Sequence, residues 1–150
     1  MNNDQSRRRR RLAAFSLAPL DQLAEGLKRI CPRPGHTFLR RPESGLVMVR
    51  GRIGNTGPAF NIGEMLVTRC TVQYRGLLGH GWTPGRTARQ AELAALGDAL
   101  GQAAEHAGAI DRLVEKLEKI KQNQEARQSA ELEDSQVDFF TLLRGEDQND

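Results

Sequence analysis

The sequence predicts an α+β fold: a small antiparallel β-sheet, a meander of about three to four strands, with N-terminal helices and two C-terminal helices. Two β-rich runs, Gly45–Ile53 and Glu64–Tyr74, flank a glycine-rich bend, and a third run, Leu77–Trp82, follows a short turn. Since β-branched and aromatic residues fit a pleated surface and glycines allow tight turns, these runs are expected to pair in sequence order. The flanking sequence repeats its apolar residues at helical spacing, which predicts helices packed on one face of the sheet.

Length and composition predict a single domain with tails. The 150 residues are 38% apolar and 5% aromatic, which allows a modest core and is thin for a self-sufficient enzyme with a deep pocket. We expect a basic flexible N-terminus at 1–11, a single α+β domain at 12–136, and a C-terminal apolar anchor segment with an acidic tail at 137–150. No run approaches the roughly 20 apolar residues of a membrane helix, and no signal peptide is recognisable.

Charge is divided unevenly along the chain. Residues 1–86 carry 15 basic and 5 acidic side chains, a net charge of +10, whereas residues 87–150 carry 7 and 14, a net charge of −7. Fourteen of the 15 basic residues are arginine, whose planar guanidinium suits carboxylates and phosphates. The pattern fits a solvated basic surface, and it also fits an anionic ligand or a partner with acidic patches.

The run Arg7–Arg11 favours either a polyanion contact or an exposed helix end that contacts a partner. No aromatic residue is interleaved, so base stacking has no platform and the second interpretation is preferred. Pro19 begins the next helix. Its apolar stripe consists of Leu20, Leu23, Ala24, Leu27 and Ile30. His36–Arg41 is then expected to form a short edge strand that ends at Pro42.

The predicted strands alternate between two faces. One face of the first strand carries Leu46, Met48, Arg50 and Arg52, and the other is wholly apolar. Gly51 indicates a bulge or a close approach to the backbone. If the register permits, Arg69 stands beside Arg50 or Arg52 and forms an anion or acidic-partner site. The candidate anion or partner contacts are Arg50, Arg52, Arg69, Arg86 and Trp82.

Few residues have the spacing of a metal, redox or phosphate site. Cys31 and Cys70 stand alone without CxxC spacing, which favours a reduced cytoplasmic protein. His80 has no second ligand at metal spacing and is expected to be structural or at an interface. The glycine-rich bend at 54–63 lacks the GxxxxGK[ST] spacing and no helix follows it, so a long hairpin loop that docks on a partner is favoured.

Two helices are predicted after the sheet. Thr87 and Gln90 have the spacing of a capping box, and this helix is expected to reach about His106, with Gly108 as its C-cap. Gly97 and other small residues in its stripe predict very close packing against the sheet or another helix.

The second helix is expected to run from Ile110 to about Asp134, although its apolar stripe stops after Ile120. An apolar clump then follows in an acidic neighbourhood, and we expect it to anchor the chain on this domain or on a partner. The candidate interface anchors are Val137, Phe139, Phe140 and Arg144.

Three sequence blocks together resemble one known family. They are Glu43–Leu46 with Gly51–Arg69, then Gly79–Arg86, and the terminal VDFF followed by Arg144-Gly145. The blocks resemble PhnG, the small subunit of the bacterial carbon–phosphorus lyase core complex, and their order agrees over nearly the whole chain. The run Arg7–Arg11 is not part of the resemblance.

The resemblance implies an accessory role in phosphonate metabolism. It implies a cytoplasmic hetero-oligomer that makes an alkylphosphonate ribose triphosphate from an alkylphosphonate and a nucleoside triphosphate (ATP), before carbon–phosphorus bond cleavage on a different subunit. It also implies PhnI, PhnH and PhnJ-like partners, with the nucleosidase-like chemistry on PhnI. For this chain we expect no catalytic residue, metal or cofactor site. Two alternatives stay open: arginines that bind phosphonate or triphosphate at a shared site, and, less expected, a nucleic-acid-binding module.

Overall fold

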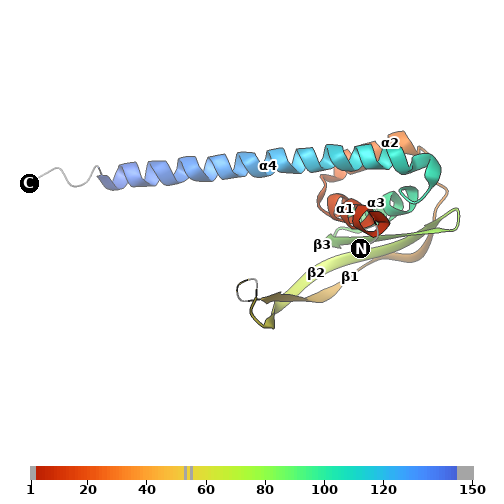
Figure 1. The fold of residues 1–150 in the computed structure, drawn as a ribbon, viewed down its shortest axis with the longest axis horizontal. Helices are drawn as coiled ribbons and strands as arrows, with labels where there is room; N and C mark the ends of the chain where they lie inside the picture. Colours follow the sequence, from red (N-terminus) through yellow and green to blue (C-terminus); the bar gives the residue numbers. More distant parts are fainter. Residues whose placement is uncertain (1–2, 53, 55, 145–150) are drawn as a thin grey trace, which may run out of the picture. The chain divides into compact units, whose positions relative to one another are not determined.

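The computed structural model describes residues 3–52, 54 and 56–144, with side chains described as far as residue 132. In chain order its elements are α1 (Asn3–Leu17), α2 (Leu20–Ile30), β1 (Thr37–Arg52), β2 (Ala59–Tyr74), β3 (Leu77–Pro84), α3 (Ala88–Leu100) and α4 (Ala104–Arg144). The strands form one antiparallel sheet in the order β1-β2-β3, with helices before and after it (Figure 1). The predicted α+β class is confirmed.

Contacts divide the chain into two units, Met1–Leu117 and Glu118–Asp150. The first unit contains the sheet, α1, α2, α3 and the beginning of α4, so it ends earlier than the predicted domain limit at residue 136. The second unit contains the rest of α4. Its described side chains from 121 to 132 are all exposed, and Lys121 pairs with Glu125 one turn later at 3.5 Å.

The sheet has three strands, and two segments that were predicted as separate strands belong to one of them. The predicted edge strand at 36–41 and the run beginning at Gly45 both belong to β1, which is 16 residues long. Proline cannot donate a ladder hydrogen bond and was expected to end the strand. Instead, Pro42 falls in the register shift between Arg40 and Glu43, and a bulge of this kind lets pairing resume on the other side.

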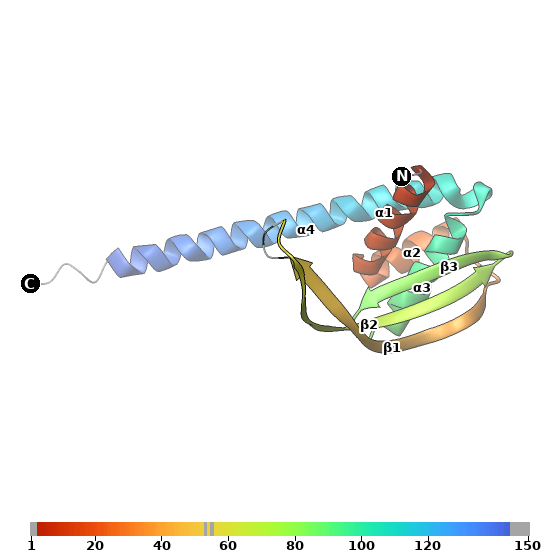
Figure 2. The ribbon, with the colours of Figure 1, turned by 60° about the horizontal axis from the view of Figure 1, so that its bottom comes forward.

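Helix α3 joins the sheet to α1 and α2. It contacts all three strands and also α1 and α2, and it lies against one face of the sheet (Figure 2). The core between these elements is made of apolar side chains with almost no exposed surface. The largest are Phe15, Leu23, Val72, Leu100, Ile110 and Leu117. Burial of such side chains supplies most of the favourable free energy of folding.

Glycines allow β3 and α3 to touch through their backbones. A Cβ on Gly79 would stand 2.0 Å from Ala95 O, and a Cβ on Gly81 would stand 2.1 Å from Ala91 O. On the opposite side of α3, a Cβ on Gly97 would stand 2.5 Å from a ring carbon of Phe15 in α1. The predicted close packing of the small residues of α3 is therefore confirmed.

Helix boundaries depart from prediction at both ends of the chain. Residues 3–11, expected to be part of a flexible segment, lie within α1. Helix α3 ends at Leu100 rather than near His106, and the predicted C-cap Gly108 lies inside α4.

The predicted capping box is wrong. The Thr87 hydroxyl makes no cap hydrogen bond and contacts Thr83 Oγ1 at 2.7 Å instead. Gln90 Nε2 donates to the carbonyls of Phe15 and Ala18, at 2.7 and 3.0 Å, and so holds the end of α1 against α3.

Candidate functional site

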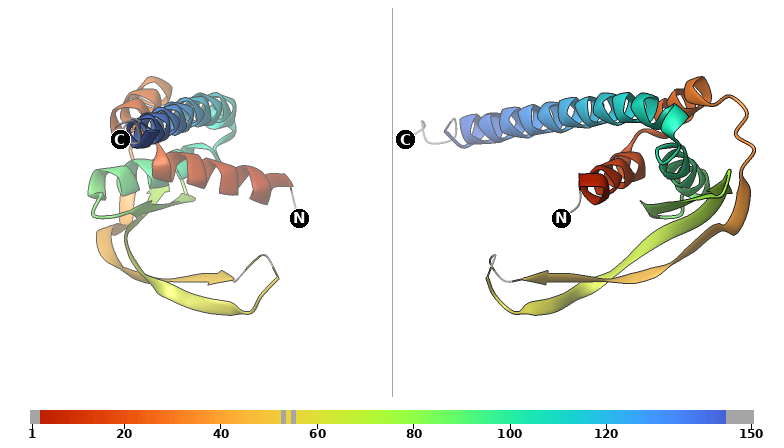
Figure 3. Two further views of the ribbon diagram at one scale, coloured as in Figure 1. Left: turned by 90° about the vertical axis from the view of Figure 1, so that its left-hand side faces the viewer. Right: turned by 45° about the vertical axis from the view of Figure 1, so that its right-hand side comes forward.

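The β1–β2 hairpin continues past the end of β3. β3 pairs only with Val67–Tyr74 of β2, so the hairpin beyond that point has no third strand. We call the paired residues 46–52 and 59–66 the arm (Figure 3). A two-stranded hairpin is marginally stable by itself in water, which makes the arm a candidate for contact with another molecule.

Large apolar side chains are exposed along the arm. They are Leu46, Met48, Phe60, Ile62 and Met65. Their exposed fractions range from 44% for Phe60 to 63% for Leu46, and Trp82 at the base of the arm is 48% exposed. Scattered exposed apolar residues are normal, but a contiguous set on one element typically marks an interaction surface.

Register assigns these side chains to two faces. Leu46 and Met48 continue the face of Ser44 and Thr68, which bond to each other at 2.8 Å. Val47 pairs with Met65 on the other face. Both faces of the arm therefore carry apolar side chains. The sequence predicted a wholly apolar face only for the side of Val47.

A register shift bends the arm between Val49 and Arg50, which pair with Gly63 and Asn61. Ile62 is the extra residue, and a Cβ on Gly51 would stand 2.5 Å from its Cδ1. Gly51 was predicted to mark a bulge or a close approach to the backbone; the bulge is present next to it but on β2, and the close contact is with a side chain.

The base of the arm carries an arginine, a tryptophan and a carboxylate on its open face. The Arg69 guanidinium lies over the Trp82 ring, 5.8 Å from its centre, and donates to Glu43 Oε1 at 2.6 Å. Arg40 donates to the same oxygen at 2.5 Å. Hydrogen bonds from Arg40 and then Arg69 hold the pKa of Glu43 below its usual value. Glu43, Arg69 and Trp82 border an open groove of about 390 Å³ that also includes Val47 and Val67.

A second cluster joins α1 to α3. Asp98 has no exposed surface and accepts hydrogen bonds from Arg8 at 2.7 and 3.1 Å and from Arg11 at 2.9 Å. It also accepts from the backbone N–H of His80 at 3.0 Å. The two guanidinium groups and the backbone N–H offset the loss of hydration of this buried carboxylate, although the buried Nε of Arg11 has no hydrogen-bond partner.

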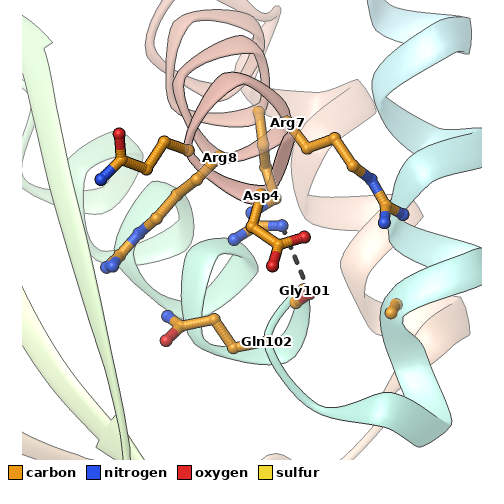
Figure 4. Close-up of a pocket in the computed structure, with 8 residues that line it drawn as sticks. Asp4, Arg7, Arg8, Gly101 and Gln102 are labelled. Atoms are coloured by element: carbon orange, nitrogen blue, oxygen red, sulfur yellow. Dashed lines mark hydrogen bonds between the residues drawn. The ribbon is translucent and has the colours of Figure 1, made fainter. Parts of the chain in front are cut away.

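This cluster lines a pocket of about 430 Å³, shown in Figure 4. Arg7, Arg8 and Arg11 all line it, and Arg11 donates to Gly101 O at 3.3 Å. Arg7 pairs with Asp111, and Asp4 is a further carboxylate in the wall. Arg7, Arg8 and Arg11 are thus held by Asp98 and Asp111 behind the pocket, which reduces the positive charge that they offer to a polyanion.

Comparison with known proteins gives the chain a family. A family model described as "Phosphonate metabolism protein PhnG" matches residues 6–145. A relative in Rhizobium meliloti (strain 1021), "Alpha-D-ribose 1-methylphosphonate 5-triphosphate synthase subunit PhnG", is 39% identical over 143 residues, which cover 95% of this chain and 92% of the relative. The chain belongs to the PhnG family. The resemblance seen in the sequence is therefore confirmed.

The blocks that carry the resemblance to PhnG fall largely on the arm and its base. Gly51–Arg69 contains the tip of the arm and its second strand, and Gly79–Arg86 contains most of β3 with Trp82. The third block lies in α4 and beyond. Val137, Phe139, Phe140 and Arg144 are helical, but their side chains lie outside the described residues, so their role as anchors stays a prediction.

Register separates the arginines that were expected to cluster in this PhnG chain. Arg69 pairs with Glu43 and Trp82 near the base, whereas Arg50 and Arg52 pair with Asn61 and Ala59 near the tip. The prediction that Arg69 stands beside them is wrong, since their pairing positions on β2 lie eight and ten residues from Arg69. Arg86 is exposed just after β3.

Asp98 is the residue whose importance the sequence analysis missed. The available signal was a carboxylate within an otherwise apolar and small-residue segment of α3, Ala94-Ala95-Leu96-Gly97-Asp98-Ala99. Buried charges require a partner, and the arginine run was the only dense source of one. His80 meets expectation as a structural residue, because its Nδ1 lies 3.2 Å from Thr71 Oγ1.

A third pocket, of about 450 Å³, lies between the end of α2 and the start of α4. Tyr74 and His106 meet there, with the phenol oxygen 3.3 Å from Nε2, and burial raises the pKa of Tyr74. Cys31 also lines this pocket, whereas Cys70 is buried elsewhere beneath β1. Within the described residues, no three His, Cys, Asp or Glu side chains gather to hold a metal ion. None of the helical segments searched there is long and apolar enough to cross a membrane.

Proposed function

We propose that this chain is a non-catalytic, accessory subunit of a cytoplasmic transferase that makes α-D-ribose 1-alkylphosphonate 5-triphosphate in the carbon–phosphorus lyase pathway. The substrates are a nucleoside triphosphate, ATP, and an alkylphosphonate. The observation that carries the proposal is the 39% identity to a synthase subunit over 95% of this chain. At this identity and coverage the fold and the mode of assembly are expected to be shared.

The surface of the chain supports a role in assembly. The arm exposes apolar side chains on both faces, as subunits of stable complexes do before they associate. Three arginines of the α1 run, Arg7, Arg8 and Arg11, are instead engaged with Asp98 and Asp111. PhnI, PhnH and PhnJ-like subunits are the proposed partners, with the transferase chemistry on PhnI.

The test is co-expression of this chain with the other synthase subunits, followed by purification through a tag on one of them. We expect this chain to co-purify, and the complex to form the ribose triphosphate product, detected by ³¹P NMR. The isolated chain is expected to form no product from ATP and methylphosphonate. Turnover by the isolated chain would overturn the accessory role.

One observation favours a second function. Arg50 and Arg86 are exposed, and no described carboxylate forms an ion pair with either. Arginines of this kind could contact a phosphonate or triphosphate at a site shared with a partner. If so, Arg50→Ala and Arg86→Ala would leave the complex assembled and lower its activity. Loss of assembly instead would favour the accessory role.

A further inference from the structure

The arm presents two faces that the described part of the first unit leaves bare. Leu46 is 63% exposed on the face that continues from Thr68, and Ile62 is 62% exposed on the side of Gly51. The outer edge of β2 beside the arm is also without a strand, because β3 ends at its pairing with Val67. A contact with a flat surface would cover only one of these faces.

The tip of the arm is cationic. Arg50 and Arg52 lie on the same face as Leu46 and Met48, and no described carboxylate forms an ion pair with either. Glu64, opposite Met48, is the one acidic residue in the arm, and it pairs with neither arginine. Among the described residues, Arg52 donates to the carbonyl of Gly57, at 3.3 Å. A binding partner that buries this face must supply negative charge, since an unpaired buried guanidinium is costly.

We propose that the arm inserts into a groove of a different polypeptide, another subunit of the synthase. One wall of this groove is apolar and faces Val47, Ile62 and Met65. The opposite wall carries carboxylates that pair with Arg50 and Arg52. The proposal rests on the proposed function, because that function supplies the partner subunit.

A second copy of this chain fits the arm less well. In a symmetric dimer the same face of each arm meets its twin. Packing through the face of Leu46 would bury Arg50 and Arg52 of both copies, and the arm offers only Glu64 on that face to pair with them, so positive charge would be left unpaired. Packing through the face of Ile62 would leave the other apolar face exposed. Insertion into an acidic and apolar groove covers both faces and pairs the charges.

The first experiment measures the affinity of this chain for the complex of the remaining synthase subunits. Ile62→Asp and the double variant Arg50→Glu/Arg52→Glu each alter one face of the arm. We expect each to weaken binding about tenfold or more, as loss of central apolar or charge-paired contacts does. Leu39→Asp, which changes a 57% exposed leucine of β1 outside the arm, and Arg33→Glu are the matched controls and are expected to bind like the parent chain.

Circular dichroism of each variant checks that the fold is kept. If the two arm variants fold and bind as tightly as their controls, the insertion model is overturned. The parent chain is measured in the same experiment, so that failure of the insertion model can be told from failure of the proposed function. If the parent chain binds and the arm variants bind equally well, only the insertion model is refuted. Absence of binding by the parent refutes the subunit role itself.

The second experiment identifies the occupant. A photo-crosslinking phenylalanine analogue replaces Phe60 on the arm, and the same analogue replaces Leu39 as the control. In the assembled complex we expect the analogue at Phe60, but not at Leu39, to crosslink to a different subunit near acidic residues. A crosslink to a second copy of this chain or to its own residues 118–150 would overturn the proposal, as would no crosslink in an assembled complex.

Discussion

The carboxylate of Asp98 in α3 and the guanidinium of Arg11 in α1 form a buried ion pair at 2.9 Å, with side-chain exposures of 0% and 7%. Arg8 donates to both carboxylate oxygens, at 2.7 and 3.1 Å, so one acidic residue fixes two turns of α1 against the core. The arginine run of this chain is thus in part a structural element.

Removing Asp98 is expected to destabilise the chain strongly. Asp98→Ala leaves Arg11 buried without its counter-ion and the His80 N–H without its acceptor, and loss of one partner of a buried pair costs about 3–5 kcal/mol. Urea denaturation followed by circular dichroism measures the change. The control is Asp111→Ala, which breaks the exposed pair with Arg7 and is expected to cost less than about 1 kcal/mol. Equal effects of the two changes would contradict the structural role of Asp98.

Filling the gap at Gly97 is expected to separate α1 from α3. Alanine favours helix over glycine by about 1 kcal/mol, but its Cβ would stand 2.5 Å from the Phe15 ring. Overpacking of this kind costs about 1–3 kcal/mol, so Gly97→Ala should destabilise and Gly97→Leu should do so more severely. The free energy of unfolding is the readout. Phe15→Leu in the same background should recover part of the loss, and a stabilised Gly97→Ala chain would show that the contact relaxes freely.

The two cysteines are expected to differ in reactivity. Burial raises the pKa of the Cys70 thiol to about 11, and its Sγ lies 3.3 Å from Arg40 O. At pH 8 only about one Cys70 in a thousand would then be thiolate, the reactive form. Iodoacetamide should therefore modify the partly exposed Cys31 first, as mass spectrometry of peptides shows, and Cys70 only after denaturant is added. Rapid labelling of Cys70 in a folded Cys31→Ser chain would contradict this assignment.

The pKa of Glu43 reports on the base of the arm. Because Arg40 and Arg69 hold this pKa below its ordinary value of 4.5, the stabilisation from the pair is present above that pH and is lost as pH falls toward the lowered pKa. A carboxyl titration by NMR should place the midpoint below 4.5, and Arg40→Ala should raise it. High salt should raise it as well, since the site is exposed. A midpoint that does not respond to Arg40→Ala would exclude this arginine as the main cause.

Periodicity was sufficient to predict the central elements. Helix α2 begins and ends at the residues that its apolar stripe indicates, Leu20 and Ile30, and the three strands pair in sequence order. These segments are predictable because one period of burial dominates each of them. The resemblance to PhnG was likewise readable, since its blocks lie on elements with distinctive glycine and arginine spacing.

Features that depend on contacts between residues distant in the sequence could not be predicted from local patterns. The run Arg7–Arg11 has good helix propensity, but its main acidic partner is Asp98, about 90 residues away, and no local pattern shows that pairing. Thr87 and Gln90 have capping spacing, yet contacts with Thr83 and with α1 take precedence. Arg69 lies far from Arg50 because of the register in which β1 and β2 pair. The sequence of the bend between these strands does not determine that register, so it could not be predicted.

The arm has no third strand beside it, although at its base the Gly85 N–H donates to the Leu66 carbonyl at 2.8 Å. It can therefore open without unfolding the remainder of the first unit, because local opening requires only the free energy of the contacts it breaks. A newly made copy that finds no companion would offer these strands to proteases, while an assembled copy would not. Degradation would then match the cellular amount of this polypeptide to the number of places available for it.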